Sequence, residues 1–291
     1  MGLPSRSAFL FSQPILTPPF VSYLFDSSSP QHSHDRRCGR FGFTLIEILV
    51  VMGIIIVLAG IAVPVYGTIR ERSNKVVTLN NMRQVTGALI TYVGQDDGDF
   101  PMENIGTGET WTNAATPAAA KVWYNVLPRQ LGSKGVGDYA TSPRAFYTKE
   151  NLLFLPGAKY PSSDKKLVAP LFAFAINTKL QRKDASNVKV KAKQSQITHP
   201  ARTVAFLEVG LPKEKKASKV QPKYDGSSKA AGKSFVERYG GLGVLTFLDG
   251  HAESVSVKDL LTETGLLIHP QSRIIWTRTP EEDPNAAPPK Q

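Results

Sequence analysis

Cysteine is almost absent from this chain of 291 residues, which has a single one, Cys38. One cysteine allows no intramolecular disulfide bond, so the fold must hold together without one. Everything after Cys38 lacks cysteine, and that part can therefore occupy an oxidising compartment without thiol chemistry.

Sequence motifs of the common enzyme classes are also lacking. There is no G-x-S-x-G nucleophile motif and no nucleotide-binding glycine loop. Histidine is scarce, and the five present are His32, His34, His199, His251 and His269. We therefore predict that the protein is not an enzyme and that it has no catalytic residues, no cofactor and no metal site.

Positive charge exceeds negative charge, with a formal net charge of +11, but most of the charges are dispersed. One concentration, KEKKASKVQPKYDGSSKAAGK, runs from Lys213 to Lys233. Its Gly, Ser and Pro residues favour a solvated loop, and a patch for nucleic acid or another anionic surface is the alternative. Aromatic residues are not interleaved with the lysines, so no stacking platform forms and nucleic acid is not an expected partner.

One long hydrophobic run stands out, from Phe43 to Val63, with Glu47 as its only charge. These 21 residues would form a helix about 31 Å long, which matches the hydrocarbon core of a bilayer. The run therefore predicts a single transmembrane helix, with bounds 43–64.

Basic residues flank the hydrophobic run on both sides. Three arginines precede it, at positions 36, 37 and 40, and three basic residues follow it, at positions 70, 72 and 75, offset by Glu71. Positive charge favours the cytoplasmic side, so we expect the N-terminal side to stay inside and the rest to be periplasmic. The bias is moderate because both sides are basic.

Two ordinary interpretations of the run leave Glu47 unexplained. A secretory signal peptide has a shorter apolar region and a small-residue cleavage site, whereas here Pro64 lies beside the candidate site. A plain signal anchor needs no acid. A carboxylate costs about 2.5–3.5 kcal/mol at mid-membrane and less near an end. Glu47 is therefore a candidate functional residue whose partner has to be identified.

The segment GFTLIEILVVMGIIIVLAGIAVP closely resembles the N-terminus of type IV prepilins and type II secretion pseudopilins. The resemblance implies that a prepilin peptidase cuts after Gly42 and methylates the new N-terminal amine of Phe43. It also implies that Glu47 pairs with an N-terminal amine, usually that of a neighbouring subunit, during filament assembly. Pro64 falls where the family has a helix-disturbing proline.

Physical chemistry agrees with that role for Glu47. An ammonium group makes a buried carboxylate tolerable, and removal of one partner of such a pair costs about 3–5 kcal/mol. The pair would also fix the register between helices whose apolar contacts slide easily. The partners implied by the resemblance are prepilin peptidase, other pilin or pseudopilin subunits and an inner-membrane assembly platform.

The predicted domain organisation follows from these boundaries. Residues 1–42 form a leader peptide, which is long for the family, and a start codon assigned too far upstream would explain its length. Residues 65–278 form a pilin-like periplasmic domain. Residues 279–291, which end in PEEDPNAAPPKQ, form a disordered tail.

Residues 65–94 continue as an amphipathic helix. Its predicted apolar stripe consists of Ile69, Val76, Leu79, Met82, Leu89 and Tyr92. This stripe can form a core contact of the domain or a lateral contact in a filament. The punctuation GQDDGDFP predicts a stop at 94–98. The acids there do not have EF-hand spacing, so calcium is not expected.

The globular part favours an α+β fold in which the long N-terminal helix packs on a small antiparallel sheet, as in pilins. Apolar and β-branched runs predict strands at 170–176, 203–209, 243–248 and 273–278. Short helices are predicted at 121–131 and 257–264.

Asp249-Gly250 predicts a hairpin with a type I′ turn. The surrounding RYGGLGVLTFLDGHAE resembles the C-terminal strand pair of a pseudopilin-like group that has a histidine ten residues before the Asp-Gly; Tyr239 stands there in this chain. In an uninterrupted strand, Asp249, His251 and Glu253 would share a face and could bind a metal, but the hairpin breaks that strand.

Two functions therefore remain after the sequence is read. The favoured one is a structural prepilin-like subunit of a type II secretion pseudopilus or a type IV pilus-like filament. The alternative is a single-pass, membrane-anchored periplasmic enzyme or ligand-binding protein that does not assemble.

Overall fold

The computed structural model describes residues 42–280 apart from 107, 164–166, 184–188, 191, 266 and 268–272. The predicted leader, except Gly42, and the predicted tail beyond Pro280 therefore lie outside the described residues. The chain divides into two compact units, residues 1–54 and 55–291. Of the first unit, the structure describes the start of one long helix.

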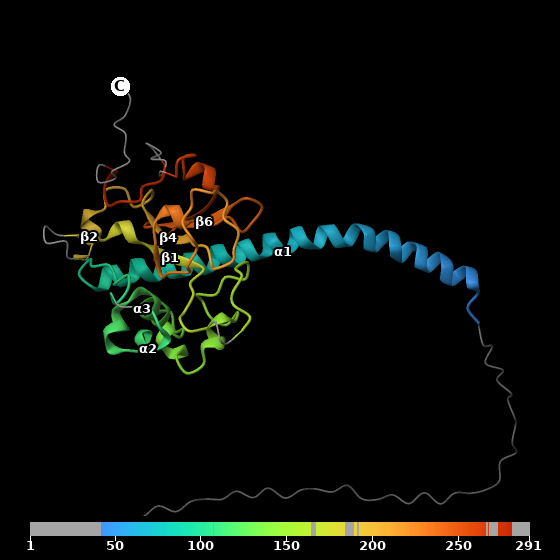
Figure 1. The fold of residues 1–291 in the computed structure, drawn as a ribbon, viewed down its shortest axis with the longest axis horizontal. Coiled ribbons are helices and arrows are strands. Elements are labelled where there is room, and N and C mark those ends of the chain that lie inside the picture. The colour runs from blue at the N-terminus through green and yellow to red at the C-terminus, as the bar shows by residue number, and fades with distance from the viewer. Residues whose placement is uncertain are drawn as a thin grey trace, which may run out of the picture. The chain divides into compact units, whose positions relative to one another are not determined.

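This helix, α1, extends over Leu45–Gln95, 51 residues, and continues through Pro64 (Figure 1). It ends because Asp97 and Gly98 take positive φ angles of 53° and 79°, and Gly98 N–H donates to the carbonyl of Val93 at 2.9 Å. That contact is the six-to-one hydrogen bond of a Schellman cap, so the predicted stop at 94–98 is confirmed.

A five-stranded sheet forms the centre of the second unit, in the order β5-β1-β4-β6-β7. The bounds are Lys229–Ala230 for β5, Phe174–Asn177 for β1, Val204–Glu208 for β4, Gly243–Phe247 for β6 and Ala252–Val255 for β7. Three pairings are antiparallel, but β1 and β5 pair in parallel. The sheet is therefore mixed rather than antiparallel as predicted, and the α+β class is confirmed.

Smaller elements surround this sheet. Helices α2 (Trp111–Ala114) and α3 (Trp123–Gln130) precede it, and a separate ribbon pairs β2 (Arg182–Lys183) with β3 (Lys189–Val190). Short 3₁₀ turns occur at Pro117–Lys121, Val136–Tyr139, Pro143–Tyr147, Thr178–Leu180, Gln194–Gln196, Gly232–Ser234 and Val257–Asp259. The helix predicted at 121–131 is confirmed by α3.

Two predicted elements are wrong. Residues 273–278 form no strand, because only Ile275 makes an isolated bridge, to Thr203. Their apolar side chains are nevertheless buried, and Trp276 packs on the far face of the sheet. The helix predicted at 257–264 shortens to the 3₁₀ turn Val257–Asp259, since Leu261 already bridges to Leu267.

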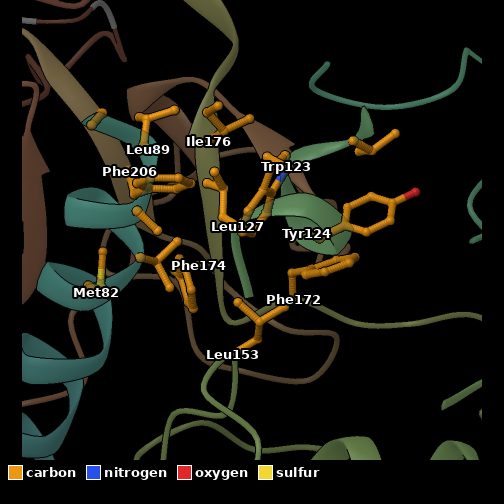
Figure 2. Close-up of a cluster of buried hydrophobic side chains, with 14 of the residues drawn as sticks. Met82, Leu89, Trp123, Tyr124, Leu127, Leu153, Phe172, Phe174, Ile176 and Phe206 are labelled. Atoms are coloured by element: carbon orange, nitrogen blue, oxygen red, sulfur yellow. The ribbon is translucent and has the colours of Figure 1, made fainter. Parts of the chain in front are cut away.

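Both faces of the sheet are covered. On one face, Met82 and Leu89 of α1 and Trp123 of α3 pack with Phe174 and Phe206 of the sheet, and the rings of Trp123 and Phe206 lie 5.1 Å apart (Figure 2). The other face packs against the C-terminal segment; its cluster includes Val204, Leu207, Leu245, Phe247, Leu260, Leu261, Leu267 and Trp276. This second layer was not predicted.

The buried stripe of α1 is rotated from the predicted one. Met82 and Leu89 are fully buried, but Ile69 and Val76 are 59% and 63% exposed. The buried positions are Thr78, Met82, Val85, Thr86, Ala88, Leu89 and Val93. Leu79 and Tyr92 of the predicted stripe also pack against the core, so the prediction is wrong for Ile69 and Val76 and it missed the two threonines.

Candidate functional site

Glu47 lies in the first turn of α1, where it completes a helix cap. Its Oε2 accepts hydrogen bonds from Thr44 N at 2.7 Å and from Thr44 Oγ1 at 2.8 Å. In return, Glu47 N donates to Thr44 Oγ1 at 3.3 Å. This reciprocal arrangement is a capping box, which satisfies N–H groups that the first helical turn leaves free.

The capping role was missed in the sequence, although the signal was present. Thr44-Leu45-Ile46-Glu47 has the T-x-x-E spacing of a capping box directly before an apolar run. Both hydrogen bonds from Thr44 go to Oε2, so the second oxygen, Oε1, receives no hydrogen bond within the part of the chain that the structure describes. One carboxylate can therefore cap its own helix and still accept from another donor.

The predicted cleavage junction lies directly before this cap. Gly42 and Phe43 precede α1 in irregular backbone, and the Phe43 side chain is 82% exposed. A Cβ built on Gly42 would meet nothing within 4 Å. Phe43 is adjacent to Thr44, so an amine at Phe43 would form one residue, about 3.8 Å between Cα atoms, from the residue that Glu47 binds.

The helix after the cap is apolar and unburied. It contains a stretch long and apolar enough to cross a membrane, and none of that stretch is buried. Exposed apolar side chains include Leu45, Ile46, Leu49, Ile54, Ile56, Leu58 and Ile61, and beyond the run Val65, Tyr66 and Ile69. This surface requires a lipid or protein environment. The kink at Pro64 remains a prediction.

A buried polar network, which the sequence reading missed, joins α1 to the sheet. Arg238 Nη1 lies 2.8 Å from Glu208 Oε1, and Arg238 Nη2 lies 2.7 Å from Glu214 Oε2. Tyr239 Oη is 2.6 Å from Thr78 Oγ1 and donates to Glu208 Oε1 at 3.4 Å. All three charged side chains are nearly inaccessible, at 6% exposure or less.

One arginine, Arg238, is shared by the two carboxylates of this network, Glu208 and Glu214. Burial raises the pKa of the Glu208 carboxyl, against the opposing effects of Arg238 and of the Val244 N–H. Burial also opposes ionisation of Glu214, but hydrogen bonds from Arg238 and from backbone N–H groups outweigh it and lower that pKa. Although burial disfavours its charge, the two carboxylates raise the pKa of Arg238. The available sequence signal was a single acid within an otherwise apolar run, Glu208 in TVAFLEV.

The hairpin predicted at Asp249-Gly250 is confirmed, because β6 and β7 pair on either side of it. Its turn is not type I′, since Gly250 has a positive φ of 97° but Asp249 does not. Gly250 N–H donates to the carbonyl of Phe247 at 2.9 Å, so the tight turn begins one residue earlier than predicted. A turn followed by one left-handed glycine is the common three-residue alternative.

The three side chains considered for a metal do not converge. His251 Nδ1 contacts Asp249 Oδ1 at 2.6 Å, and the His251 ring stacks on Phe247 at 4.3 Å. Glu253 instead forms an ion pair with Arg273. Within the described ranges, no three Asp, Glu, His or Cys side chains are placed to hold a metal ion.

The lysine-rich stretch 213–233 is more ordered than a solvated loop. Gln221 and Tyr224 are buried, and Gln221 Nε2 donates to the carbonyl of Phe235 at 2.6 Å. Lys229 is half-buried and pairs with Glu103 at 3.2 Å. The other lysines of the stretch are exposed: Lys213, Lys215, Lys216, Lys219, Lys223 and Lys233.

Comparison with known proteins adds one finding. Residues 37–63 match the family model for the prokaryotic N-terminal methylation motif. Neither the curated proteins nor the solved structures contain a significant match to the chain. The matched residues include the predicted junction Gly42–Phe43 and the capping acid Glu47. The chain thus carries a prepilin-type N-terminal segment, and this motif supports a prepilin-like protein of the type IV pilin family.

Proposed function

We propose that this chain is a structural subunit, cleaved after Gly42 and N-methylated at Phe43, that assembles into a type II secretion pseudopilus or a type IV pilus-like filament. The observation that carries the proposal is the methylation motif at 37–63 on a helix whose apolar surface is exposed. Its partners are a prepilin peptidase, other pilin-type subunits and an inner-membrane assembly platform. The folded domain is periplasmic before assembly and becomes part of the filament afterwards.

Glu47 has two successive tasks in this proposal. Before cleavage its carboxylate caps α1 through Thr44. After cleavage, Phe43 carries an N-terminal ammonium group. Oε1 of Glu47 then accepts a hydrogen bond from the N-terminal ammonium of a neighbouring subunit. Charge neutralisation then makes the acid tolerable among apolar helices and fixes their register.

Exposed apolar residues beyond the membrane segment are consistent with lateral packing in a filament. On α1, the exposed fractions lie between 42% and 67% for Val65, Tyr66, Ile69, Val76 and Val77. A helix that keeps such residues on its outer surface has unsatisfied apolar area. In the proposal, the α1 helices of adjacent subunits cover it.

The first test is the intact mass and N-terminal sequence of the membrane-extracted protein, from cells with and without a prepilin peptidase. We expect a peptidase-dependent N-terminus at Phe43 that carries a methyl group. An uncut chain in both strains would overturn the processing and leave the anchored protein that does not assemble. Cleavage beyond Val63 would exclude a filament subunit, because the secreted protein would lack the helix.

The second test separates the charge of Glu47 from its cap. Glu47→Gln keeps an oxygen for Thr44 but removes the charge, whereas Glu47→Ala removes both. We expect both variants to be processed and neither to appear in sheared filaments. Glu150→Gln, which removes a charge from an exposed loop, is the control and should assemble. Normal assembly of Glu47→Gln would refute the charge pair.

A further inference from the structure

Basic side chains gather around α1 just beyond the membrane segment. Arg70 and Arg72 are exposed and Lys75 is half-buried, all on the helix itself. Lys159 and Lys213, from two distant loops, are also exposed. We call these five residues the basic collar: Arg70, Arg72, Lys75, Lys159 and Lys213.

A chain of contacts brings the two loops to the helix. The N–H of Gly240 donates to the carboxylate of Glu71, and Tyr239 bonds to Thr78. The neighbouring Arg238 holds Glu214 at 2.7 Å, and Glu214 Oε1 accepts from the N–H of Lys159 at 3.0 Å. The loops that carry Lys159 and Lys213 are therefore linked to residues 71–78 of α1 through Glu214 and Arg238.

The acids at this end of the domain do not neutralise the collar. Glu214 is 6% exposed and paired with Arg238, and Glu208 is fully buried in the same network. The Glu71 carboxylate accepts a backbone N–H. Glu71 keeps its charge when it accepts this N–H, but the five cations of the collar exceed it by four, so the surface is positive.

Lys213 stands in a backbone position that normally favours glycine. The N–H of Glu214 donates to the carbonyl of Leu211 at 3.0 Å, and Lys213 has a φ of 78° at the third residue of this turn. With Pro212 at the second position, this is the geometry of a type II turn, where glycine is the usual third residue. A lysine in this strained position is a reason to test whether its side chain has a function.

The collar begins just beyond the lipid headgroups, within the range over which their charges act. Glu71 is eight residues beyond Val63, about 12 Å along the helix. The headgroup region extends roughly 5–8 Å beyond the hydrocarbon core, and charges act over about 10 Å at moderate salt. Tyr66, 67% exposed, lies between the apolar run and the collar, where aromatic residues mark the membrane interface.

We propose that the basic collar binds the anionic phospholipid headgroups of the membrane that α1 spans, and so holds the folded domain against the membrane surface before assembly. The inference rests on the membrane insertion included in the proposed function. Positive residues on the exported side weaken the charge bias that orients a membrane helix. Those at positions 70, 72 and 75 therefore do not serve the topology, and headgroup binding gives them a function. The ligand chemistry is the phosphate of a lipid; duplex nucleic acid would be the competing polyanion.

The test uses the full-length chain reconstituted into vesicles of phosphatidylcholine, with or without roughly one-third phosphatidylglycerol. Amine-reactive labelling followed by mass spectrometry reports the accessibility of each lysine. We expect Lys159 and Lys213 to be labelled several-fold more slowly in anionic vesicles, and about 0.5 M NaCl to reverse this. Lys121 and Lys134, exposed elsewhere in the domain, are internal controls that should not change.

Matched variants sharpen the test. The triple variant R70Q/R72Q/K75Q should abolish the protection of Lys159, because each of the three charges strengthens binding to anionic lipid by about five-fold at low salt. The triple variant K121Q/K134Q/K149Q removes the same charge from exposed sites elsewhere and should leave protection intact. Lys213→Gly should keep or raise thermal stability, because it relieves the positive φ, while the protection of Lys159 falls.

Three results would overturn the collar. Equal labelling in neutral and anionic vesicles would exclude headgroup binding. Protection by duplex DNA added to neutral vesicles, without protection by anionic lipid, would assign the surface to nucleic acid. Equal loss of protection in both triple variants would reduce the effect to net charge. A chain that inserts and shows lysine protection, but is never processed at Gly42, would refute the filament proposal without contradicting headgroup binding by the collar.

Discussion

Tyr239 Oη lies 2.6 Å from Thr78 Oγ1, so the turn that leads into β6 is hydrogen-bonded to helix α1. A second contact of the same kind joins Thr86 Oγ1 to Thr246 Oγ1 of β6 at 2.7 Å. Thr78 and Thr86 are eight residues apart, about 12 Å along one helix face. These two hydrogen bonds are directional, so they fix the rotation of α1 about its own axis against the sheet. Apolar packing alone would define this rotation less precisely.

Tyr239→Phe should therefore destabilise the domain by about 1–3 kcal/mol, because the hydroxyl of buried Thr78 loses its partner. The measurement is chemical unfolding of the detergent-solubilised protein. Tyr66→Phe, which removes a hydroxyl from an exposed ring, is the matched control and should change little. An unchanged midpoint in Tyr239→Phe would mean that the contact to Thr78 contributes nothing to stability.

Arg238→Met should cost more, about 3–5 kcal/mol, because it leaves two buried carboxylates, Glu208 and Glu214, without a counter-ion. The same unfolding experiment measures the loss. Adding Glu208→Gln to Arg238→Met should recover part of it, since one uncompensated charge is removed.

The exposed pair Arg129–Asp138, at 2.6 Å, provides the control for Arg238. Arg129→Gln should cost about 1 kcal/mol or less, because solvent screens the pair. Similar losses in Arg238→Met and Arg129→Gln would contradict the account of the buried network.

Local patterns were sufficient to predict α1, its stop near Gly98, and the central strands β4 and β6. Each of these is a long or uniformly apolar segment with turn residues beside it. The segment around Trp276 was predicted as a strand because its residues are β-branched and aromatic, but burial there comes from packing on the sheet rather than from pairing. A pattern of burial does not distinguish these two sources.

The candidate site was predictable in its residues and only partly in its geometry. The motif around Gly42, Phe43 and Glu47 is contiguous in the sequence, so it could be read directly. Arg238 and Glu208, which bond to each other, are 30 residues apart in the sequence. Thr78 of α1 and its partner Tyr239 are 161 residues apart. Such pairings arise from tertiary packing and have no local signature.

Alkaline pH should destabilise the protein through its buried tyrosines. Burial raises the pKa of Tyr224 to about 12, and likewise that of Tyr147. The unfolded chain loses these protons near pH 10, so between about pH 10 and 12 the unfolded state binds fewer protons and stability falls as pH rises. Tyr224 alone can account for up to about 3 kcal/mol over that window.

Phenolate absorbance and far-ultraviolet circular dichroism, recorded together during an alkaline titration, check the role of these tyrosines. Tyr224→Phe should flatten the pH dependence of stability between about pH 10 and 12 relative to the unsubstituted protein. Ionisation of all tyrosines near pH 10, with the fold intact, would contradict the burial effect.

Thr44→Val distinguishes the cap of α1 from the charge of Glu47 as the requirement for assembly. Valine keeps the branched shape but removes Oγ1, so the N–H of Glu47 loses its acceptor and Oε2 loses one of two donors. The helix start should weaken by about 1 kcal/mol. The carboxylate is retained and is less engaged, so processing and assembly should both persist, as measured by the amount of subunit in sheared filaments. Thr44→Ser, which keeps the hydroxyl, should behave like the unsubstituted chain. If Thr44→Val abolished assembly as completely as Glu47→Gln, the ordered helix start rather than the negative charge would be the property that the filament requires.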